Sequence, residues 1–235
     1  MSKVVLITGV GRRLGLVLST RLLEQGWQVI GTYRTETPVI ETLRNLGMEA
    51  YKVDFKIQQE VNDFIGKIKD RHARLDALIH NASDWLPESD TGRHFETIEY
   101  MMQVHVNAPY VMNLELSALL QASDGMADII HVTDYVAEKG SQKHIAYAAS
   151  KAALANMTLS FAQLLAPKVK VNAIAPALML FNETDDNQYK VKARAKSILQ
   201  REGGADEFIR AVEYLLASTY VTGRTLPLDG GRHIK

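Results

Sequence analysis

The chain has 235 residues and a formal net charge of zero, so no basic surface favours nucleic acid or an anionic membrane. Hydrophobic residues make up 46% and charged residues 23%, which is ordinary for a globular protein. The absence of cysteine excludes disulfide bonds, thiolate metal sites and thiol catalysis, and no apolar run reaches the roughly 20 residues of a membrane span.

Short β-branched runs alternate with longer helical patterns along the chain. The sequence predicts strands at residues 3–8, 28–33, 49–53, 75–80, 128–133, 169–175 and 225–228. It predicts helices at residues 13–25, 37–47, 58–72, 95–121, 144–166, 188–200 and 206–217. This alternation predicts one α/β domain, residues 1–235: a Rossmann-type, doubly wound, parallel seven-stranded sheet with helices on both faces.

The first predicted strand begins by residue 3. It leaves no room for the charged segment, apolar segment and cleavage site of a secretory leader. We therefore expect a cytoplasmic protein.

The stretch TGVGRRLG, residues 8–15, joins the first predicted strand to the first predicted helix. Gly9 permits a sharp turn, and Gly15 permits close packing of the helix on the sheet. The helix N-terminus offers free N–H groups and a positive dipole end to a pyrophosphate. The pattern predicts a dinucleotide site rather than an ordinary tight turn. Arg13 puts a long cation beside the phosphates and the substrate, unless it is a solvated surface arginine.

The end of the second predicted strand indicates which dinucleotide binds. A site for NAD places a carboxylate on the ribose 2′-hydroxyl there, whereas this strand ends in Tyr33-Arg34-Thr35. Arg34 suits a 2′-phosphate through its planar fork, with Arg12 assisting. The sequence thus predicts NADPH/NADP+. We assign Glu36 to the start of the next helix, where negative charge is favoured.

Tyr147 and Lys151 lie four residues apart on a predicted helix, which places a phenol and an ammonium on one face. A free phenol has a pKa near 10. A nearby cation is expected to lower that pKa and make the phenol a better acid. Asp134 stands thirteen residues before the tyrosine, directly after a predicted strand.

The motifs TGVGRRLG, HNAS, VHVNAPY, YAASK, VKVNAIAPA and VTGRTLPLDGG resemble those of the short-chain dehydrogenase/reductase family, over essentially the whole chain. HNASDW, HVTDYV and NETDD resemble its pteridine-reductase branch more closely. The chain departs from the wider family in several places: Arg13, Ser83 and Ala177 replace glycine, His80 replaces asparagine, and Asp134 replaces serine.

The resemblance implies the residues of the site. The expected catalytic residues are Tyr147, Lys151, Asp134 and Asn107. The expected contacts of NADPH are Gly9, Arg12, Arg13, Leu14, Gly15, Arg34, Asp54, Phe55, Asn81, Ala82, Ser83, Tyr147, Lys151, Pro176, Ala177 and Leu178. The expected contacts of the substrate are Arg13, Ser83, Trp85, Asp134, Tyr147 and Leu180.

Three of these residues carry a second interpretation. Asp54 contacts adenine or caps a turn. Asn107 completes the proton relay or caps a local helix bend. Trp85 stacks on a flat ring or packs on its own loop.

The carboxylate of Asp134 indicates the class of substrate. Reducing a ketone builds negative charge on oxygen, which a nearby carboxylate opposes. Reducing a C=N bond requires protonation of nitrogen. A carboxylate suits that reaction, because it accepts ring N–H bonds when ionised and lends acidity through Tyr147 when protonated. Asp134 therefore favours a nitrogen heterocycle, unless it only caps a loop.

We expect NADPH-dependent reduction of a 7,8-dihydropterin, with dihydromonapterin the main substrate and dihydrofolate a weaker one. The hydride goes to C6 and the proton to N5. The alternatives are a carbonyl or 3-oxoacyl-thioester reductase of the same family, and a non-catalytic NADP-sensing protein.

The seven histidines show no metal-ligand spacing, and the acidic cluster in residues 183–186 is typical of a solvated loop. We expect no metal. The family resemblance implies a homotetramer, with no nucleic-acid or membrane partner. Residues 176–187 are expected to form a loop at the ligand edge of the sheet.

Overall fold

The computed structural model describes residues 2–88 and 92–235. Seven strands form one parallel sheet in the order β3-β2-β1-β4-β5-β6-β7. In chain order they are β1 (Val4–Ile7), β2 (Gln28–Tyr33), β3 (Glu49–Lys52), β4 (Ala77–His80), β5 (Ala127–Val132), β6 (Val169–Pro176) and β7 (Thr225–Leu228). The predicted doubly wound parallel sheet is confirmed.

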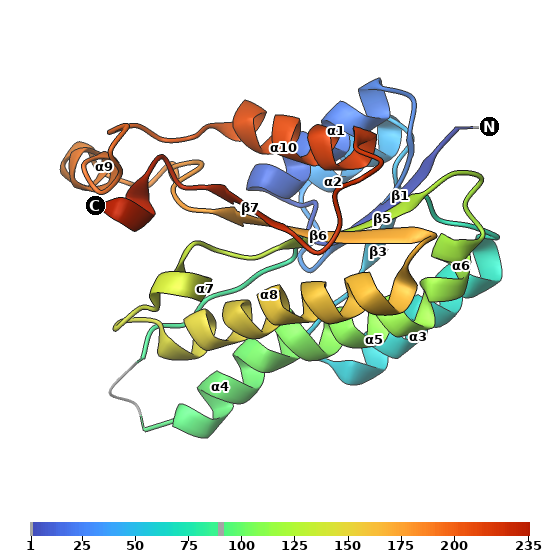
Figure 1. The fold of residues 1–235 in the computed structure, drawn as a ribbon, viewed down its shortest axis with the longest axis horizontal. Coiled ribbons are helices and arrows are strands. Elements are labelled where there is room, and N and C mark those ends of the chain that lie inside the picture. Colours follow the sequence, from blue (N-terminus) through green and yellow to red (C-terminus); the bar gives the residue numbers. More distant parts are fainter. Residues whose placement is uncertain (1, 89–91) are drawn as a thin grey trace.

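Helices cover both faces of the sheet (Figure 1). One face carries α1 (Arg13–Glu24), α2 (Pro38–Asn45) and α10 (Ala205–Ala217). The other carries α3 (Gln58–Arg71), α4 (His94–Met102), α5 (Ala108–Glu115), α6 (Ser117–Gln121) and α8 (Ile145–Leu165). Three short helices lie together at one end of the sheet: α7 (Val136–Lys139), α9 (Asn187–Arg194) and the 3-10 turn η2 (Arg232–Ile234).

The central strands explain why their sequences are apolar on both faces. Leu6, Leu78, Ile129 and Val171 are paired in register across four strands and face the α3, α5 and α8 side. Successive side chains point to opposite faces of a strand, so their neighbours pack under α1, α2 and α10. Two apolar cores therefore hold the sheet between two helix layers.

The predicted helix at 95–121 is not continuous. A π-helical turn, η1 (Gln103–Asn107), separates α4 from α5, and a second break at Leu116 separates α5 from α6. Pro109 lacks the N–H that an α-helix directs at the carbonyl of His105, which accounts for the irregular turn at this place.

Two smaller differences concern the far end of the sheet. The helix predicted at 188–200 ends at Arg194, and the chain then turns through Gln200, whose φ of 52° lies in the left-handed region. The short helices α7 and η2 were not predicted, because four and three residues are too few to show a helical period.

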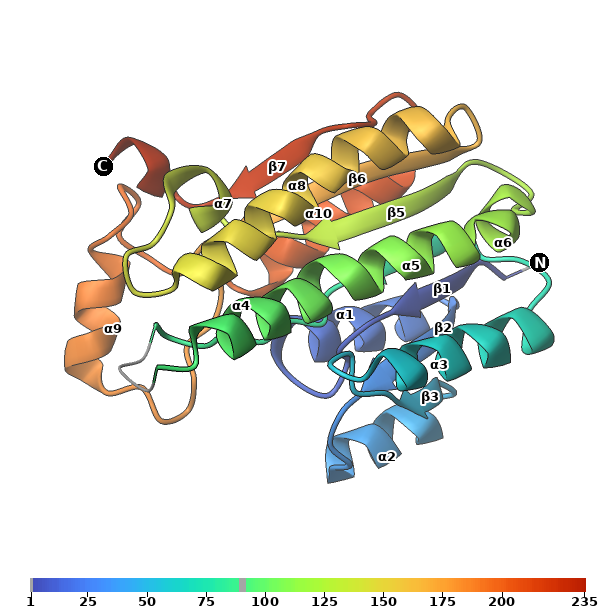
Figure 2. The ribbon, with the colours of Figure 1, turned by 90° about the horizontal axis from the view of Figure 1, so that it is seen from below.

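The carboxyl ends of the parallel strands meet at one edge of the sheet, and the segments that follow β5 and β6 lie there with α7 and α9 (Figure 2). Ligands of open α/β sheets bind at this edge. Within the described ranges, every helix is too short or too polar to cross a bilayer.

Candidate active site

The turn after β1 can only be made with glycine at two positions. Gly9 has a φ of 75°, and a Cβ on it would lie 2.8 Å from the Cα of Ala82. A Cβ on Gly15 would lie 2.1 Å from the carbonyl oxygen of Gly9. The turn therefore brings the N-terminus of α1 against the carboxyl end of β1, as a pyrophosphate site requires.

Asn81 and Thr8 brace this turn. The Asn81 amide donates to the carbonyl oxygens of Thr8 and Gly9, each at 3.0 Å. The Thr8 hydroxyl accepts from the backbone N–H groups of Asn81 (3.0 Å) and Ala82 (2.9 Å). The side chain of Asn81 thus shapes the turn. Its predicted contact with the cofactor, like that of Ala82, stays a prediction.

Arg13 connects the turn to the loop that follows β6. Its φ is 53°, a conformation that glycine adopts easily and other residues rarely. Its guanidinium donates to the Leu180 carbonyl oxygen at 2.9 Å and to the Asn182 side chain. The structure therefore places Arg13 between the predicted phosphate site and the predicted substrate loop. Leu14 packs at the edge of the core under α1, and Arg12 is exposed beside it.

Arg34 lies at the end of β2, as expected, but it already has partners. Its Nη1 donates to Asp84 Oδ2 at 2.6 Å and to the Tyr100 hydroxyl at 3.1 Å, and half of its side chain is exposed. A 2′-phosphate therefore has to share Arg34 with Asp84. The predicted phosphate contact remains a prediction.

Glu36 precedes α2 by two residues, so our assignment to the helix start was slightly wrong. Thr37 is the N-cap residue. The carboxylate of Glu36 accepts from Arg44 at 2.7 Å and from the Tyr33 hydroxyl at 2.5 Å. These contacts hold the Glu36 pKa below its usual value, the contact with Arg44 contributing most. Arg44 thereby neutralises a carboxylate that stands two residues after Arg34.

Asp54 adopts the turn-cap arrangement. Its Oδ1 accepts from the backbone N–H of Lys56 at 3.0 Å, and its own N–H donates to Glu60 at 2.8 Å. Phe55 is buried, and its carbonyl oxygen accepts from Gln103. Contacts of Asp54 and Phe55 with adenine remain predictions.

Tyr147 and Asp134 meet at the carboxyl edge of the sheet. The Tyr147 hydroxyl donates to Asp134 Oδ2 at 2.9 Å, while Asp134 Oδ1 accepts from the N–H of Val136 at 3.0 Å. Burial raises the pKa of Asp134, although both hydrogen bonds oppose the rise. Both side chains remain partly exposed, so a substrate can reach them.

Lys151 does not act on Tyr147 as the sequence suggested. Its ammonium is buried (1% exposed) and donates to the Val132 carbonyl oxygen at 2.8 Å, lying 5.7 Å from the centre of the Tyr147 ring. Burial lowers the pKa of Lys151 to about 8. The pKa of Tyr147 is raised well above its usual value, by burial and then by the negative charge of Asp134. The expectation of a lowered tyrosine pKa was wrong, because burial of the phenol and the neighbouring carboxylate both raise that pKa.

His105 belongs to the site and was not predicted. It is 1% exposed, and its Nε2 lies 2.9 Å from Ser83 Oγ. Its Nδ1 lies 2.8 Å from Ser150 Oγ, which donates to the Tyr147 carbonyl oxygen at 2.7 Å. The imidazole also packs edge-on against the Tyr147 ring, with ring centres 5.5 Å apart. The histidine two residues before Asn107 in VHVNAPY was the only sequence signal.

The side chain of Asn107 points away from this cluster. It is exposed, and its amide donates to Gln103 at 3.0 Å across the π-helical turn. The extra residue in that turn changes the register of the helix, so that His105 rather than Asn107 faces Tyr147. The bond to Gln103 matches the second interpretation, a contact within a helix bend. A relay role for the Asn107 side chain is not supported by its position.

Trp85 stands at the open side of the site. It is 61% exposed, and its ring packs edge-on against His144 with ring centres 4.9 Å apart. Its loop is anchored to the start of α8, because Glu88 accepts from the N–H of Ala146 at 2.8 Å. The exposed face of Trp85 is available to a flat ring, and stacking stays a prediction.

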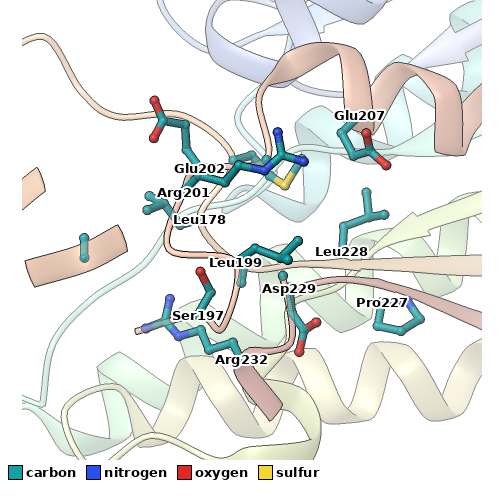
Figure 3. A pocket seen from close by; sticks show the side chains of 15 residues that line it. Leu178, Ser197, Leu199, Arg201, Glu202, Glu207, Pro227, Leu228, Asp229 and Arg232 are labelled. Carbon is teal, nitrogen blue, oxygen red and sulfur yellow. The ribbon is translucent and has the colours of Figure 1, made fainter. Parts of the chain in front are cut away.

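A pocket of about 190 Å³ lies beyond β6 and β7 (Figure 3). It is lined by the predicted cofactor residues Ala177 and Leu178, by Ser197, Leu199 and residues 201–203, and by Asp229 and Arg232 of the C-terminal segment. Pro176 stands just before it, and its carbonyl oxygen accepts from Tyr135 at 3.1 Å. The pocket thus adjoins the predicted cofactor site without including Tyr147 or Asp134 in its lining.

The comparisons with known proteins concern the family and the fold. The model of the short chain dehydrogenase family matches residues 3–193. The dihydromonapterin reductase of Escherichia coli K12 is 50% identical over 232 residues, which cover 98% of this chain and 97% of that protein.

Two solved structures share the fold across nearly the whole chain. FolM alternative dihydrofolate reductase 1 from Brucella canis, complexed with NADP, superposes with a TM-score of 0.89 at 26% identity and covers 99% of this chain and 94% of that one. The NADPH-dependent 3-quinuclidinone reductase of Rhodotorula rubra has a TM-score of 0.88 at 26% identity and covers 99% of this chain and 92% of that one.

Proposed function

Since the chain belongs to the short-chain dehydrogenase family, we propose that it is an NADPH-dependent reductase of 7,8-dihydropterins. It delivers a proton to N5 while the cofactor reduces C6, and the product is a tetrahydropterin. Dihydromonapterin is its main substrate and dihydrofolate a weaker one, in keeping with the names of the similar proteins.

The hydrogen bond from Tyr147 to Asp134 is the observation that carries this proposal. A buried carboxylate beside the phenol opposes the growth of negative charge on a substrate oxygen. The same carboxylate favours a substrate that presents N–H donors and gains a proton on nitrogen. The pair therefore suits an imine better than a ketone.

Asp134 supplies the proton, because its raised pKa favours the protonated carboxyl group. When Asp134 is protonated, its O–H can donate to the Tyr147 oxygen, which reverses the hydrogen bond and frees the Tyr147 proton for N5. Transfer from Tyr147 to N5 is then balanced by transfer from Asp134 to Tyr147. The raised pKa of Tyr147 disfavours a phenolate. In this scheme no phenolate has to persist beside the carboxylate.

The residues of the turn fit a dinucleotide. The two positions where a Cβ would collide, Gly9 and Gly15, leave backbone N–H groups facing a pyrophosphate. Arg34 and Arg12 suit the 2′-phosphate, and the family resemblance assigns the nicotinamide ribose to Tyr147 and Lys151. When bound, NADPH supplies the hydride.

The test is NADPH oxidation by the purified protein with a panel of 7,8-dihydropterins and ketones. We expect turnover with dihydromonapterin, slower turnover with dihydrofolate, and little with 3-quinuclidinone or 3-oxoacyl thioesters. Preference for a ketone would replace the proposal with the carbonyl-reductase alternative. Tight NADPH binding without turnover of any substrate would favour an NADP sensor.

We propose a homotetramer in the cytoplasm for the assembled enzyme. The outer faces of α5 and α8 expose large apolar side chains, among them Tyr110, Leu114 and Leu159, and burying them between copies would remove an apolar patch from water. Sedimentation that gives a monomer at micromolar concentration would contradict the tetramer.

A further inference from the structure

The buried imidazole of His105 determines which hydrogen-bonding role Ser83 plays. We propose that His105 is a positioning residue, which holds the Ser83 hydroxyl as an acceptor for an N–H group of the pterin ring. The orientation of Ser83 follows from the geometry, whereas the identity of the ligand rests on the proposed function.

The neighbours of His105 specify its tautomer. The backbone N–H of Asp84 can only donate, and it lies 3.3 Å from Nε2, so Nε2 holds a lone pair. At the other end of the ring, Ser150 Oγ gives its own proton to the Tyr147 carbonyl oxygen and must accept from Nδ1–H. Both ends thus require the neutral imidazole with its hydrogen on Nδ1. Burial, and then the charge of Lys151, lower the pKa of His105 well below its usual value, which disfavours the imidazolium.

The tautomer has a direct consequence for Ser83. Since Nε2 carries no hydrogen, the contact of 2.9 Å can form only if the Ser83 hydroxyl donates. A hydroxyl has one hydrogen and two lone pairs. With that hydrogen committed to His105, Ser83 has only lone pairs left for its other neighbours, which are the Tyr147 phenol and a ligand at the open side of the site.

This arrangement makes Ser83 the second acceptor of the site, after Asp134. Two acceptors complement the N–H groups of an aminopyrimidine, whereas a ketone oxygen would find no donor in Ser83. Ser83 is exposed in the free chain, and a bound ring would cover it. An analogue without the N–H group would then leave a covered acceptor unpaired, which lowers its affinity.

The first arm of the test needs no substrate. Nitrogen-15 NMR of the protein labelled at histidine distinguishes a protonated from an unprotonated ring nitrogen at each position. We expect His105 to show a protonated Nδ1 and an unprotonated Nε2 across neutral pH, and Ser83→Ala to shift the Nε2 signal. A hydrogen on Nε2, or an imidazolium, would overturn the inference.

The second arm measures steady-state kinetics with dihydromonapterin at saturating NADPH. His105→Phe keeps a ring against Tyr147 but frees the Ser83 proton. We expect KM for the pterin to rise about tenfold, as for the loss of one oriented hydrogen bond, while kcat falls much less. His105→Gln restores an acceptor near Nε2 and should recover most of the loss.

Two controls separate positioning from general damage. Combining His105→Phe with Ser83→Ala should add little to Ser83→Ala alone, because both remove the same acceptor. His80→Asn changes a buried histidine that bonds to Asn113 and touches neither Ser83 nor Tyr147; it should leave KM unchanged. Equal losses in kcat and NADPH affinity in His105→Phe, without rescue by glutamine, would show a purely structural role and overturn the inference.

The two proposals fail in different ways. If the unmodified protein reduces no dihydropterin, the proposed function fails and the pterin part of this inference fails with it, while the NMR result still decides the orientation of Ser83. If dihydropterins are reduced but His105→Phe leaves KM unchanged, the positioning role alone is wrong.

Discussion

One carboxylate lies near each end of strand β5, and the two carboxylates have different partners. At the amino end, Asp128 lies 2.7 Å from the ammonium of Lys170, and both side chains are less than 5% exposed. Just beyond the carboxyl end, Asp134 accepts from the phenol of Tyr147, while the nearby ammonium of Lys151 is bound to a backbone carbonyl.

The partner of each carboxylate determines whether that carboxylate stabilises the fold or takes part in proton transfer. Lys170 contacts Asp128 directly and also donates to the Leu215 carbonyl oxygen, so the charge of Asp128 is matched in place. Asp134 has a partner that can itself give up a proton. Burial raises the pKa of both carboxylates, but only Asp134 is placed to exchange protons with a ligand.

The largest expected effect comes from removing the phenol of the Tyr147–Asp134 pair. Tyr147→Phe removes the hydroxyl that donates to Asp134, and kcat/KM with dihydromonapterin should fall by about 10²- to 10⁴-fold. NADPH affinity, measured by fluorescence titration, should survive. Activity within about threefold of the unmodified protein would remove Tyr147 from the mechanism.

Breaking the Asp128–Lys170 pair should lower the stability of the fold rather than the activity. Lys170→Met leaves Asp128 buried without its cation, and the free energy of unfolding should fall by about 3–5 kcal/mol at neutral pH. The matched control is Asp128→Leu with Lys170→Met, in which apolar side chains replace both charges and most of the loss should be recovered. Urea unfolding measures both, and kcat should be unchanged while the variants are folded.

Asp134→Ser places beside Tyr147 the serine that the wider family has at this position. Serine does not replace the proton that the carboxyl group supplies, so dihydropterin turnover should fall by about 10²-fold. With Tyr147→Phe in the same chain, the loss should be much smaller than the product of the single losses, because the two residues form one relay. Full dihydropterin turnover in Asp134→Ser, with unchanged NADPH affinity, would make the carboxylate structural after all.

Asp128 should make the stability of the fold depend on pH. Its pKa is raised to about 6 in the folded chain, by burial against the opposing effect of Lys170, and is near 3.9 in an unfolded chain. Between these values the folded state holds a proton that the unfolded state has lost. Asp128 therefore lowers stability as pH rises from about 4 to about 6, by about 2–3 kcal/mol, with no further change above. Urea unfolding from pH 4 to pH 7 should show this decrease in the unmodified protein. The double variant Asp128→Leu with Lys170→Met should lack it.

The smallest effect is expected at a third carboxylate, Asp84, whose cation lies at the surface. Arg34 is half exposed and is shared with Asp84, so its contact with a 2′-phosphate should be worth about tenfold in affinity. Arg34→Asp should reduce the preference for NADPH over NADH by that factor. Arg44→Asp, which makes the same change of charge and frees Glu36 nearby, is the matched control and should change the preference less. Equal use of the two cofactors by the unmodified protein would remove the role assigned to Arg34.

The local pattern of the sequence determined the sheet and the phosphate turn. Leu6, Leu78 and Ile129 lie in strands whose apolar character on both faces already required helices on both sides. Gly9 and Gly15 are dictated by contacts closer than any Cβ allows. The spacing of Tyr147 and Lys151 also needed only a helix, which α8 provides. Each of these depends on neighbours in sequence or on one regular period.

Only the tertiary structure decided which side chains meet in the site. A π-helical turn before Pro109 directed His105 rather than Asn107 toward Tyr147, and no periodicity in the sequence marks such a turn. The pKa of Tyr147 is raised by its burial and by the charge of Asp134, and both depend on how α8 packs against the segment that follows β5. Residue types and spacing along one chain state which groups are available. The distances in the folded chain determine which group gives up a proton and which charge acts on that group.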